Sequence, residues 1–241
     1  MDVKIAETRA EMGAMAAAEI AAALRAKLEE QGGVRVVFAA APSQSEMLRA
    51  LIAEPGIDWA RVTAFHMDEY IGLSEDAPQR FGLWLRREIF DLVPLKYHLL
   101  DPGEDAEARC AQYASLLAAG AIDFVLLGVG MNGHLAFNDP PADLHDPAMV
   151  KVVELDELCR TQQVEDGCFA ALELVPRQAV TLTVPALLRG ERMFCCVPGK
   201  LKAQAVRAMM QEPVSGECPA TALREHPACT VYLDRDSAAL L

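Results

Sequence analysis

Residues 34–53 read VRVVFAAAPSQSEMLRALIA and join a short strand to the start of a helix. The run from Val34 to Ala40 is apolar at nearly every position and rich in β-branched residues, which is typical of a parallel strand buried on both faces. Ser43 and Glu46 have the spacing of a capping box, which predicts a helix from there to about Ala53. A strand that leads into a helix is the repeating unit of parallel α/β sheets.

Strands and helices alternate in the same way along the rest of the chain. Strands are predicted at residues 61–66, 122–128, 193–197 and 229–233, helices at 8–30, 80–90, 106–119 and 200–210, and further apolar segments at 151–155 and 179–184. This alternation favours an α/β fold with a mostly parallel sheet and helices on both faces. No repeat, low-complexity segment or linker divides the chain, so we expect a single domain across residues 1–241.

The composition is that of an acidic protein with enough apolar residues for a large core. Of the 241 residues 52% are hydrophobic, and 22 basic against 35 acidic residues give a net charge of −13. This balance provides no general positive field for a nucleic acid, so an anionic ligand must be held by local geometry.

The sequence also favours a cytoplasmic protein. No apolar run reaches the roughly 20 residues of a membrane helix, and the N-terminus lacks the apolar stretch of a secretory signal. The seven cysteines show neither a CxxC pair nor a zinc-site spacing. They are therefore expected to be reduced thiols, without a metal site.

Two adjacent carboxylates follow the strand predicted at residues 61–66. In VTAFHMDEY, residues 62–70, Asp68 and Glu69 lie just beyond its carboxyl end. Open α/β sheets bind ligands at that end of their strands, where a carboxylate can act as a general acid or base. A solvated pair of loop carboxylates would have the same sequence, so position alone leaves both interpretations open. The polar loops at 67–78 and 131–146 both follow predicted strands and are expected at this edge.

A glycine-rich segment, LGVGMNGHLAFNDPP, occupies residues 127–141. Gly128, Gly130 and Gly133 match the GxGxxG of dinucleotide sites, and Glu154 lies 21 residues beyond Gly133. We reject a nicotinamide site, because that motif must lead into a helix and the prolines of NDPP exclude one here. The glycines instead let the backbone approach a ligand closely and place His134, a proton shuttle suited to neutral pH, at the end of the loop.

The two segments resemble the signature segments of the glucosamine-6-phosphate deaminase family, which is related to 6-phosphogluconolactonase. The resemblance rests on VTAFHMDEYIGL and LLGVGMNGHLAFNDP, residues 62–73 and 126–140, and extends over nearly the whole chain. AFN in place of a lactonase-like ASLFP favours the deaminase branch. The resemblance implies a Rossmann-like, doubly wound fold. It also implies a reaction without metal or other cofactor that turns an amino sugar phosphate into fructose 6-phosphate and ammonia.

By position, the resemblance makes Asp68 the base that moves the C2 proton and His134 the group that assists opening of the sugar ring. One group to carry a proton between C2 and C1 and one to serve the ring oxygen and O1 suffice for this chemistry. Two neighbours depart from the family pattern: Asn132 replaces an aspartate, and Asp139 replaces a glutamate. Asn132 can orient His134 but carries no charge, so the relay is expected to be rebuilt around Asp139 or weakened.

The expected phosphate site departs from the family as well. AAAPSQS, residues 39–45, replaces a Gly/Thr-rich loop, and the N-terminus of the following helix is expected to hold the phosphate, although a plain helix cap would look the same. Lys202 falls where the family has its phosphate lysine, with Lys200 beside it. A family arginine is missing near EDG at 165–167, and Arg160 is the candidate to replace it. The predicted substrate-binding residues are Ser43, Gln44, Ser45, Glu69, Gly130, Gly133, Arg160 and Lys202.

Three functions remain open from the sequence. The first is an amino-sugar-phosphate deaminase or isomerase. The second is a related hexose-phosphate isomerase or 6-phosphogluconolactonase with a changed substrate, and the third is a non-catalytic sugar-phosphate sensor. Each takes a small-molecule sugar phosphate as partner, and none involves a nucleic acid or a membrane. Whether the sugar carries a 2-amine or a 2-hydroxyl, and whether the chain forms a homo-oligomer, is left open. The short segment after the last strand predicts no allosteric extension.

Overall fold

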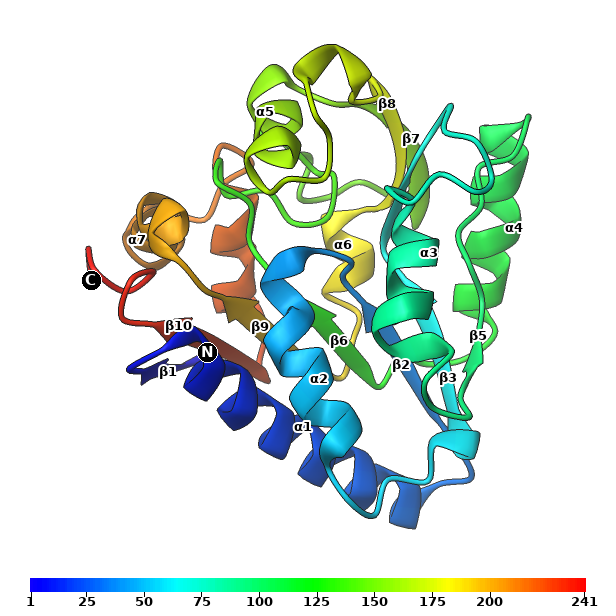
Figure 1. Cartoon of the computed structure of the whole chain (residues 1–241), viewed down its shortest axis with the longest axis vertical. Helices are drawn as coiled ribbons and strands as arrows, with labels where there is room; N and C mark the ends of the chain where they lie inside the picture. Colours follow the sequence, from blue (N-terminus) through cyan, green and yellow to red (C-terminus); the bar gives the residue numbers. More distant parts are fainter.

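The computed structural model describes residues 1–241, with a parallel sheet at the centre and helices on both of its faces (Figure 1). The strands of this sheet are β1 (Asp2–Ala6), β2 (Val34–Phe38), β3 (Val62–His66), β5 (Lys96–Tyr97), β6 (Phe124–Leu127), β9 (Arg192–Val197) and β10 (Cys229–Asp234). They lie in the order β1-β10-β9-β6-β2-β3-β5, and every neighbouring pair is parallel. The predicted α/β fold with a doubly wound sheet is confirmed.

The helices are α1 (Arg9–Glu30), α2 (Ser45–Ala53), α3 (Phe81–Leu85), α4 (Ala106–Ala118), α5 (Glu157–Glu165), α6 (Val184–Leu187) and α7 (Ala203–Gln211). A π-helical turn extends α3, and a 3₁₀ turn precedes α7. None of the helices combines the length and the apolar character needed to cross a bilayer.

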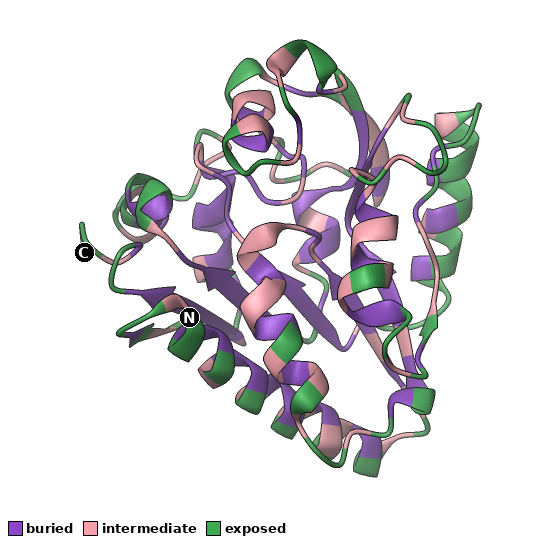
Figure 2. Ribbon diagram, viewed as in Figure 1, coloured by how far each residue is buried: buried purple, intermediate pink, exposed green.

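Two hydrophobic cores lie on opposite faces of the central sheet. Val36 and Phe38 of β2 belong to the core shared with α1 and α2, whereas Val37 belongs to the core shared with α4. Figure 2 shows buried residues along the central strands and exposed residues on the outer sides of the helices. The consecutive apolar residues of VRVVF are thus explained, because a strand covered on both faces has no side that must be polar.

A second, smaller sheet corrects the sequence prediction. It consists of β4 (Asp68–Tyr70), β8 (Gln178–Leu182) and β7 (Val150–Glu154), in the order β4-β8-β7, and both pairings are antiparallel. The segment at 67–78, expected to be a loop, therefore begins as a strand, and the segments at 151–155 and 179–184 do not join the central sheet. Pairing with β8 satisfies the backbone groups of β4, which lies buried directly after β3.

Two local predictions were wrong or incomplete. The capping box does not form: residues 42–44 make a 3₁₀ turn, α2 begins at Ser45, and no side chain caps it. Glu46 instead pairs with Arg9, whose Nε lies 2.8 Å from its Oε1. Strand β1 was not predicted, because an edge strand that pairs only with β10 needs no continuous apolar run; its Ile5 is 52% exposed.

The chain reverses its direction of travel across the sheet between β2 and β6. Strands β3 and β5 extend the sheet on one side of β2, whereas β6, β9 and β10 extend it on the other side. The carboxyl ends of β2 and β6 therefore flank a crevice, which is where open α/β sheets bind their ligands. The small sheet adds β4 to the same region, since a single residue separates β3 from β4.

Candidate active site

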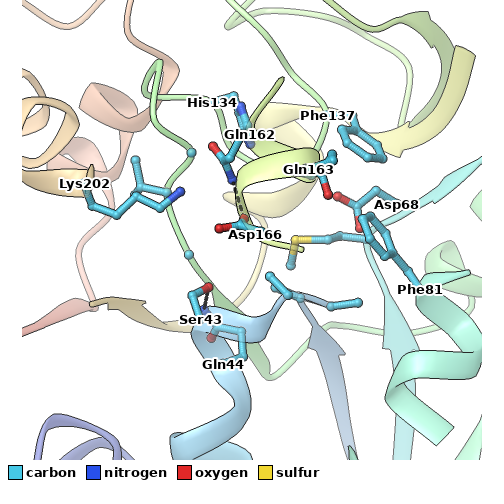
Figure 3. A pocket seen from close by; sticks show the side chains of 18 residues that line it. Ser43, Gln44, Asp68, Phe81, His134, Phe137, Gln162, Gln163, Asp166 and Lys202 are labelled. Carbon is cyan, nitrogen blue, oxygen red and sulfur yellow. Dashed lines mark hydrogen bonds between the residues drawn. The ribbon is translucent and has the colours of Figure 1, made fainter. Parts of the chain in front are cut away.

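A pocket opens at the carboxyl ends of β2 and β6 (Figure 3). Its walls come from the loop after β2, the start of β4, the glycine-rich loop after β6, the end of α5 and the turn before α7. The lining residues are Ala39, Ala40, Ala41, Ser43, Gln44, Met67, Asp68, Phe81, Gly128, Val129, Gly130, His134, Ala136, Phe137, Gln162, Gln163, Asp166 and Lys202. Six of the predicted site residues thus meet in one cavity: Ser43, Gln44, Asp68, Gly130, His134 and Lys202.

Asp68 is the first residue of β4, and its side chain lines the pocket. It is 6% exposed, and its Oδ1 has no hydrogen-bond partner. Burial, reinforced by the neighbouring charge of Glu69, raises the pKa of Asp68 well above its usual range. A carboxylate of this kind is a stronger base than one in water and is free to accept a proton.

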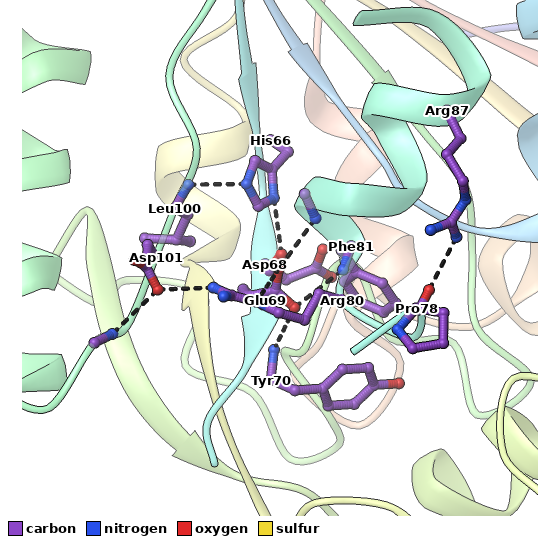
Figure 4. A network of polar contacts seen from close by, with 12 residues as sticks. His66, Asp68, Glu69, Tyr70, Pro78, Arg80, Phe81, Arg87, Leu100 and Asp101 are labelled. Carbon is purple, nitrogen blue, oxygen red and sulfur yellow. Dashed lines mark hydrogen bonds and ion pairs between the residues drawn. The ribbon is translucent and has the colours of Figure 1, made fainter. Parts of the chain in front are cut away.

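His66, the last residue of β3, fixes the backbone at Asp68 (Figure 4). Its Nε2 accepts a hydrogen bond of 2.8 Å from the backbone N–H of Leu100, so Nδ1 carries the proton and donates to the carbonyl of Asp68 over 3.0 Å. The Tyr113 hydroxyl accepts from the backbone N–H of His66 as well. Sequence reasoning assigned no role to His66, because the spacing of residues does not show which imidazole becomes enclosed.

His66 also predicts how stability changes with pH. Burial lowers the pKa of His66 to about 4, against about 6.5 in an unfolded chain. Between these pH values the unfolded chain binds a proton at His66 and the folded protein does not. The free energy of unfolding therefore rises with pH across this window, and acidification lowers it by up to about 3 kcal/mol. Urea unfolding at pH 7 and at pH 5 should show the loss in the wild type and a smaller one in His66→Gln. Parallel losses in the two proteins would contradict the prediction.

Glu69 does not reach the pocket, which corrects its predicted role in substrate binding. Its carboxylate accepts hydrogen bonds from the backbone N–H groups of Tyr70, Phe81 and Gly82 at 2.9–3.0 Å, and Arg80 Nε lies 3.7 Å from Oε2 (Figure 4). Two of these donors belong to the first turn of α3, whose N–H groups have no partners within the helix. Glu69 therefore ties α3 to β4.

His134 projects into the pocket from the glycine-rich loop. Its backbone N–H donates to Asn132 Oδ1 over 3.1 Å, and its Nδ1 lies 3.1 Å from Asp139 Oδ1, without the alignment of a hydrogen bond. The ring packs directly on Gly130, where a Cβ atom would lie 2.2 Å from it. Gly130 therefore matters because it leaves room for the imidazole, whereas Gly133 lies outside the lining and serves a turn with a φ of 82°.

Asn132 and Asp139 stand behind His134 and do not line the pocket. Asn132 Nδ2 donates to Asp139 Oδ1 over 3.1 Å and to Asp156 Oδ2 over 3.2 Å, and the backbone N–H of Asp156 donates to Asp139 Oδ2. Burial acts to raise the pKa of Asp139, but the contacts with His134 and Asn132 outweigh it and lower that pKa. Asp139 is therefore held as a charged carboxylate beside the imidazole.

Lys202 lies across the pocket from Asp68 (Figure 3). Its side chain is 8% exposed and forms no ion pair, and burial lowers its pKa. An unpaired buried ammonium is costly unless an anion arrives to meet it. Ser43 and Gln44 line the pocket with it, and the buried Gln44 Oε1 has no partner. Ser45 is not part of the lining.

Arg160 does not replace the missing family arginine. Its guanidinium donates to the carbonyls of Leu172 and Val175, so it serves the fold of that loop and stays outside the pocket. The end of α5 contributes Gln162, Gln163 and Asp166 instead, which sequence reasoning missed. The only available signal was EDG at 165–167, which marked a lost arginine and gave no sign that Asp166 turns into the pocket.

Fold and pocket together define an α/β protein with a small-molecule site at the switch point of its sheet. The chain belongs to the family of glucosamine-6-phosphate isomerases and 6-phosphogluconolactonases, whose sequence model matches residues 7–232.

Individual relatives give the same result. A glucosamine-6-phosphate deaminase from Listeria innocua is 34% identical over 212 residues, which cover 87% of this chain and 89% of the relative. A solved structure of a monomeric glucosamine-6-phosphate deaminase covers 100% of both chains, with a TM-score of 0.92 and 29% identity. A 6-phosphogluconolactonase from Thermotoga maritima covers 97% of this chain and 98% of its own, with a TM-score of 0.77 and 20% identity. The last similarity concerns the fold alone.

Proposed function

We propose that the protein is a glucosamine-6-phosphate deaminase, which converts glucosamine 6-phosphate and water to fructose 6-phosphate and ammonia. One observation carries the proposal: the free carboxylate of Asp68, the imidazole of His134 and the unpaired ammonium of Lys202 face one pocket. These groups match the needs of the reaction, namely a base, a second proton carrier and an anion site. The similarity to deaminases over most of the chain supports it.

Lys202 is the proposed phosphate anchor. Its largely buried ammonium supplies a positive charge at the wall of the pocket, where a charge-assisted contact is strong. The Ser43 hydroxyl accepts a hydrogen bond from Gln44 Nε2 over 3.1 Å, which leaves its own proton free for a phosphate oxygen. The sugar carbons then extend from Lys202 toward Asp68 on the far wall (Figure 3).

Asp68 and His134 divide the proton transfers. His134 opens the ring by giving a proton to the ring oxygen and taking up the proton that O1 loses, and the open-chain aldehyde results. Asp68 then takes the C2 proton while His134 gives a proton to O1, which forms an enolamine. Asp68 returns its proton to C1 as the amino nitrogen gives a proton back to His134, which leaves an imine at C2 beside a hydroxyl at C1. Water adds to this imine, the C–N bond breaks, and ammonia leaves. Ring opening and the shift from C2 to C1 are driven by proton transfers, to which a positioned side chain typically contributes about 10²–10⁴-fold in rate.

The direct test incubates the purified protein with glucosamine 6-phosphate and measures ammonia and fructose 6-phosphate. We expect both products in equal amounts. Circular dichroism establishes that the protein is folded, and Asp68→Asn serves as the inactive control. No turnover by folded protein would overturn the proposal. Turnover of 6-phosphogluconolactone or another hexose phosphate without ammonia would favour the related isomerase or lactonase, and binding without turnover would favour a sensor.

Lys202→Met should raise KM for the sugar phosphate by roughly 10–100-fold, because a hydrogen bond to a charged group contributes about 1.5–3 kcal/mol. The methionine keeps an unbranched side chain that is one atom shorter and removes the charged ammonium with its hydrogen-bond donors. Lys200→Met is the matched control: Lys200 is exposed on the same turn and lies outside the pocket, so its KM should stay unchanged. Equal effects of the two substitutions would show that Lys202 does not contact the phosphate.

Asn132→Asp should lower kcat about tenfold, although it restores the residue usual in the family, because lost and unsatisfied hydrogen bonds cost about 1–3 kcal/mol. Asn132 donates to both Asp139 and Asp156, and an aspartate there would place three carboxylates together. Steady-state rates measured against pH should recover partly in acid, where one carboxylate takes up a proton. Asn132→Ala adds no charge and should show no such recovery. An Asn132→Asp enzyme as active as the wild type would contradict this interpretation.

We further propose a cytoplasmic enzyme that acts as one unit across residues 1–241 on a small-molecule sugar phosphate. All seven cysteines carry free thiols, and six of them are buried, which suits a reducing compartment. The sequence leaves open whether the chain forms a homo-oligomer, and light scattering of the purified protein decides it.

A further inference from the structure

Three side chains that offer different kinds of metal-ligand atom lie close together on the His134 side of the pocket. His134, Asp139 and Cys159 each place one ligand atom within 4.8 Å of the other two. His134 and Cys159 are buried, and Asp139 is half-buried. The proton transfers assigned above do not use the Cys159 thiol, which lies in the first turn of α5 and faces Asp139.

The nitrogen in this cluster lacks a hydrogen-bond partner. His134 is 8% exposed, yet its Nδ1 makes no aligned hydrogen bond, although Asp139 Oδ1 lies 3.1 Å away. Buried polar atoms are nearly always hydrogen-bonded, so this nitrogen needs an explanation. This nitrogen lies within 4.8 Å of a carboxylate oxygen and a thiol sulfur, which are both known metal ligands.

The framework around the cluster is fixed from outside. Asn132 and the backbone N–H of Asp156 hold the carboxylate of Asp139, and the side chain of Asp156 holds the backbone N–H of Cys159. Such contacts to ligand-bearing residues orient them and strengthen metal binding. The spacing of 3.1 Å between the histidine and aspartate atoms suits two ligands of one ion, and the Cys159 sulfur lies within 4.8 Å of both.

We propose that Zn²⁺ binds to His134 Nδ1, Asp139 and Cys159 Sγ and thereby inhibits the enzyme. One nitrogen, one oxygen and one sulfur match the borderline-soft character of zinc and exclude Mg²⁺ and Ca²⁺, which prefer oxygen ligands. On binding, the thiol loses its proton to solvent as the zinc–sulfur bond forms. The pocket side of the ion stays open to water, since His134 lines the pocket.

Inhibition follows from the position of the ion and rests on the proposed function. Zinc on Nδ1 separates His134 from Asp139 and places two positive charges beside a ring that must accept and release protons. The imidazole then cannot become the doubly protonated imidazolium that gives its proton to the ring oxygen of the sugar. In the proposed mechanism the metal takes no part in the proton transfers, so its only effect is inhibition.

The test uses Co²⁺ and Zn²⁺ alone as probes of the full chain, after removal of metals with EDTA. We expect one Co²⁺ per chain, with the charge-transfer absorption of a thiolate ligand, and displacement of Co²⁺ by Zn²⁺. Cys159→Ser should lose this absorption and bind Zn²⁺ at least tenfold more weakly by calorimetry. Cys168→Ser, a substitution just beyond the same helix and outside the cluster, should bind as the wild type does.

Zinc should also inhibit the deaminase reaction of the wild type and of Cys168→Ser, and EDTA should reverse this inhibition. Inhibition of Cys159→Ser should need a zinc concentration at least tenfold higher. A wild type without the thiolate absorption, or a Cys159→Ser variant that binds zinc as tightly as the wild type, would overturn the site. The spectra decide this even if no substrate is turned over, so a failure of the proposed function stays distinguishable. Zinc bound at this site without loss of activity would overturn the inhibition.

Discussion

Asp68→Asn should lower kcat by roughly 10²–10⁴ and at the same time raise the melting temperature. The loss of rate follows because the amide cannot accept the C2 proton, and a positioned base contributes about that factor. The gain in stability follows because the wild type buries a carboxylate whose Oδ1 has no partner. An uncharged isostere removes that desolvation cost, as is common for side chains kept for function rather than stability.

The stability gain should itself depend on pH. The folded protein raises the pKa of Asp68, so it holds this proton more tightly than the unfolded chain does. That contribution is fully present below the unfolded pKa of about 3.9 and is lost as pH rises through the higher folded value. Asp68→Asn should therefore exceed the wild type in stability above that folded value, and the difference should shrink in acid.

Steady-state kinetics and thermal unfolding at several pH values check both effects. Asp76→Asn is the matched control, because Asp76 is exposed in the segment that follows β4 and should change neither. An Asp68→Asn enzyme with wild-type kcat would remove Asp68 from the proposed base role. A variant less stable than the wild type at neutral pH would show that the carboxylate is not an uncompensated buried charge.

His134→Gln should lower kcat by about 10²–10³ with little change in KM, because ring opening loses its proton donor while the phosphate anchor at Lys202 stays intact. The expected split between kcat and KM distinguishes this role from a structural one. His145→Gln, in the exposed part of the same loop, is the matched control and should behave as the wild type.

A double-mutant cycle tests whether His134 and Asp139 act as one unit. Their atoms lie 3.1 Å apart, so Asp139→Asn should lower kcat as well, and the double variant should lose little more than His134→Gln alone. Losses in kcat that multiply in the double variant would show that the two residues act independently, and the pair would then not form a relay.

Five strands of the central sheet were predictable because they are short, apolar and separated by helices with clear periodicity, whereas the edge strands β1 and β5 were not predicted. VRVVF at residues 34–38 is apolar at all positions but Arg35, which predicted burial on both faces, and the location of Asp68 and His134 after such strands predicted their place in the crevice. The small sheet was not predictable on these grounds. DEY, residues 68–70, has no strand pattern of its own and pairs with β8 only because the fold brings that strand alongside.

The different roles of the site residues were also not predictable from the sequence. Asp68 and Glu69 are adjacent acids in the sequence, yet pleating sends one carboxylate to the pocket and the other to the backbone of α3. Ser43 has the position of a helix cap in the sequence, but a 3₁₀ turn forms at residues 42–44 and the capping box does not form. Which polar residues of α5 reach the pocket depends on the packing of that helix over the crevice, and sequence spacing does not encode it.

The two ends of the pocket are formed by residues that follow or begin strands of different sheets. Ser43 and Lys202 follow strands of the large parallel sheet, and Asp68 begins a strand of the small antiparallel one. In the proposed reaction, the packing of one sheet against the other therefore sets the distance between the phosphate group and the carbon that loses its proton. The proposed substrate carries its phosphate on C6 and, with that phosphate at Lys202, would place C2 beside Asp68. A positional isomer with the phosphate on C1 would bind at the anchor and present the wrong carbon to the base.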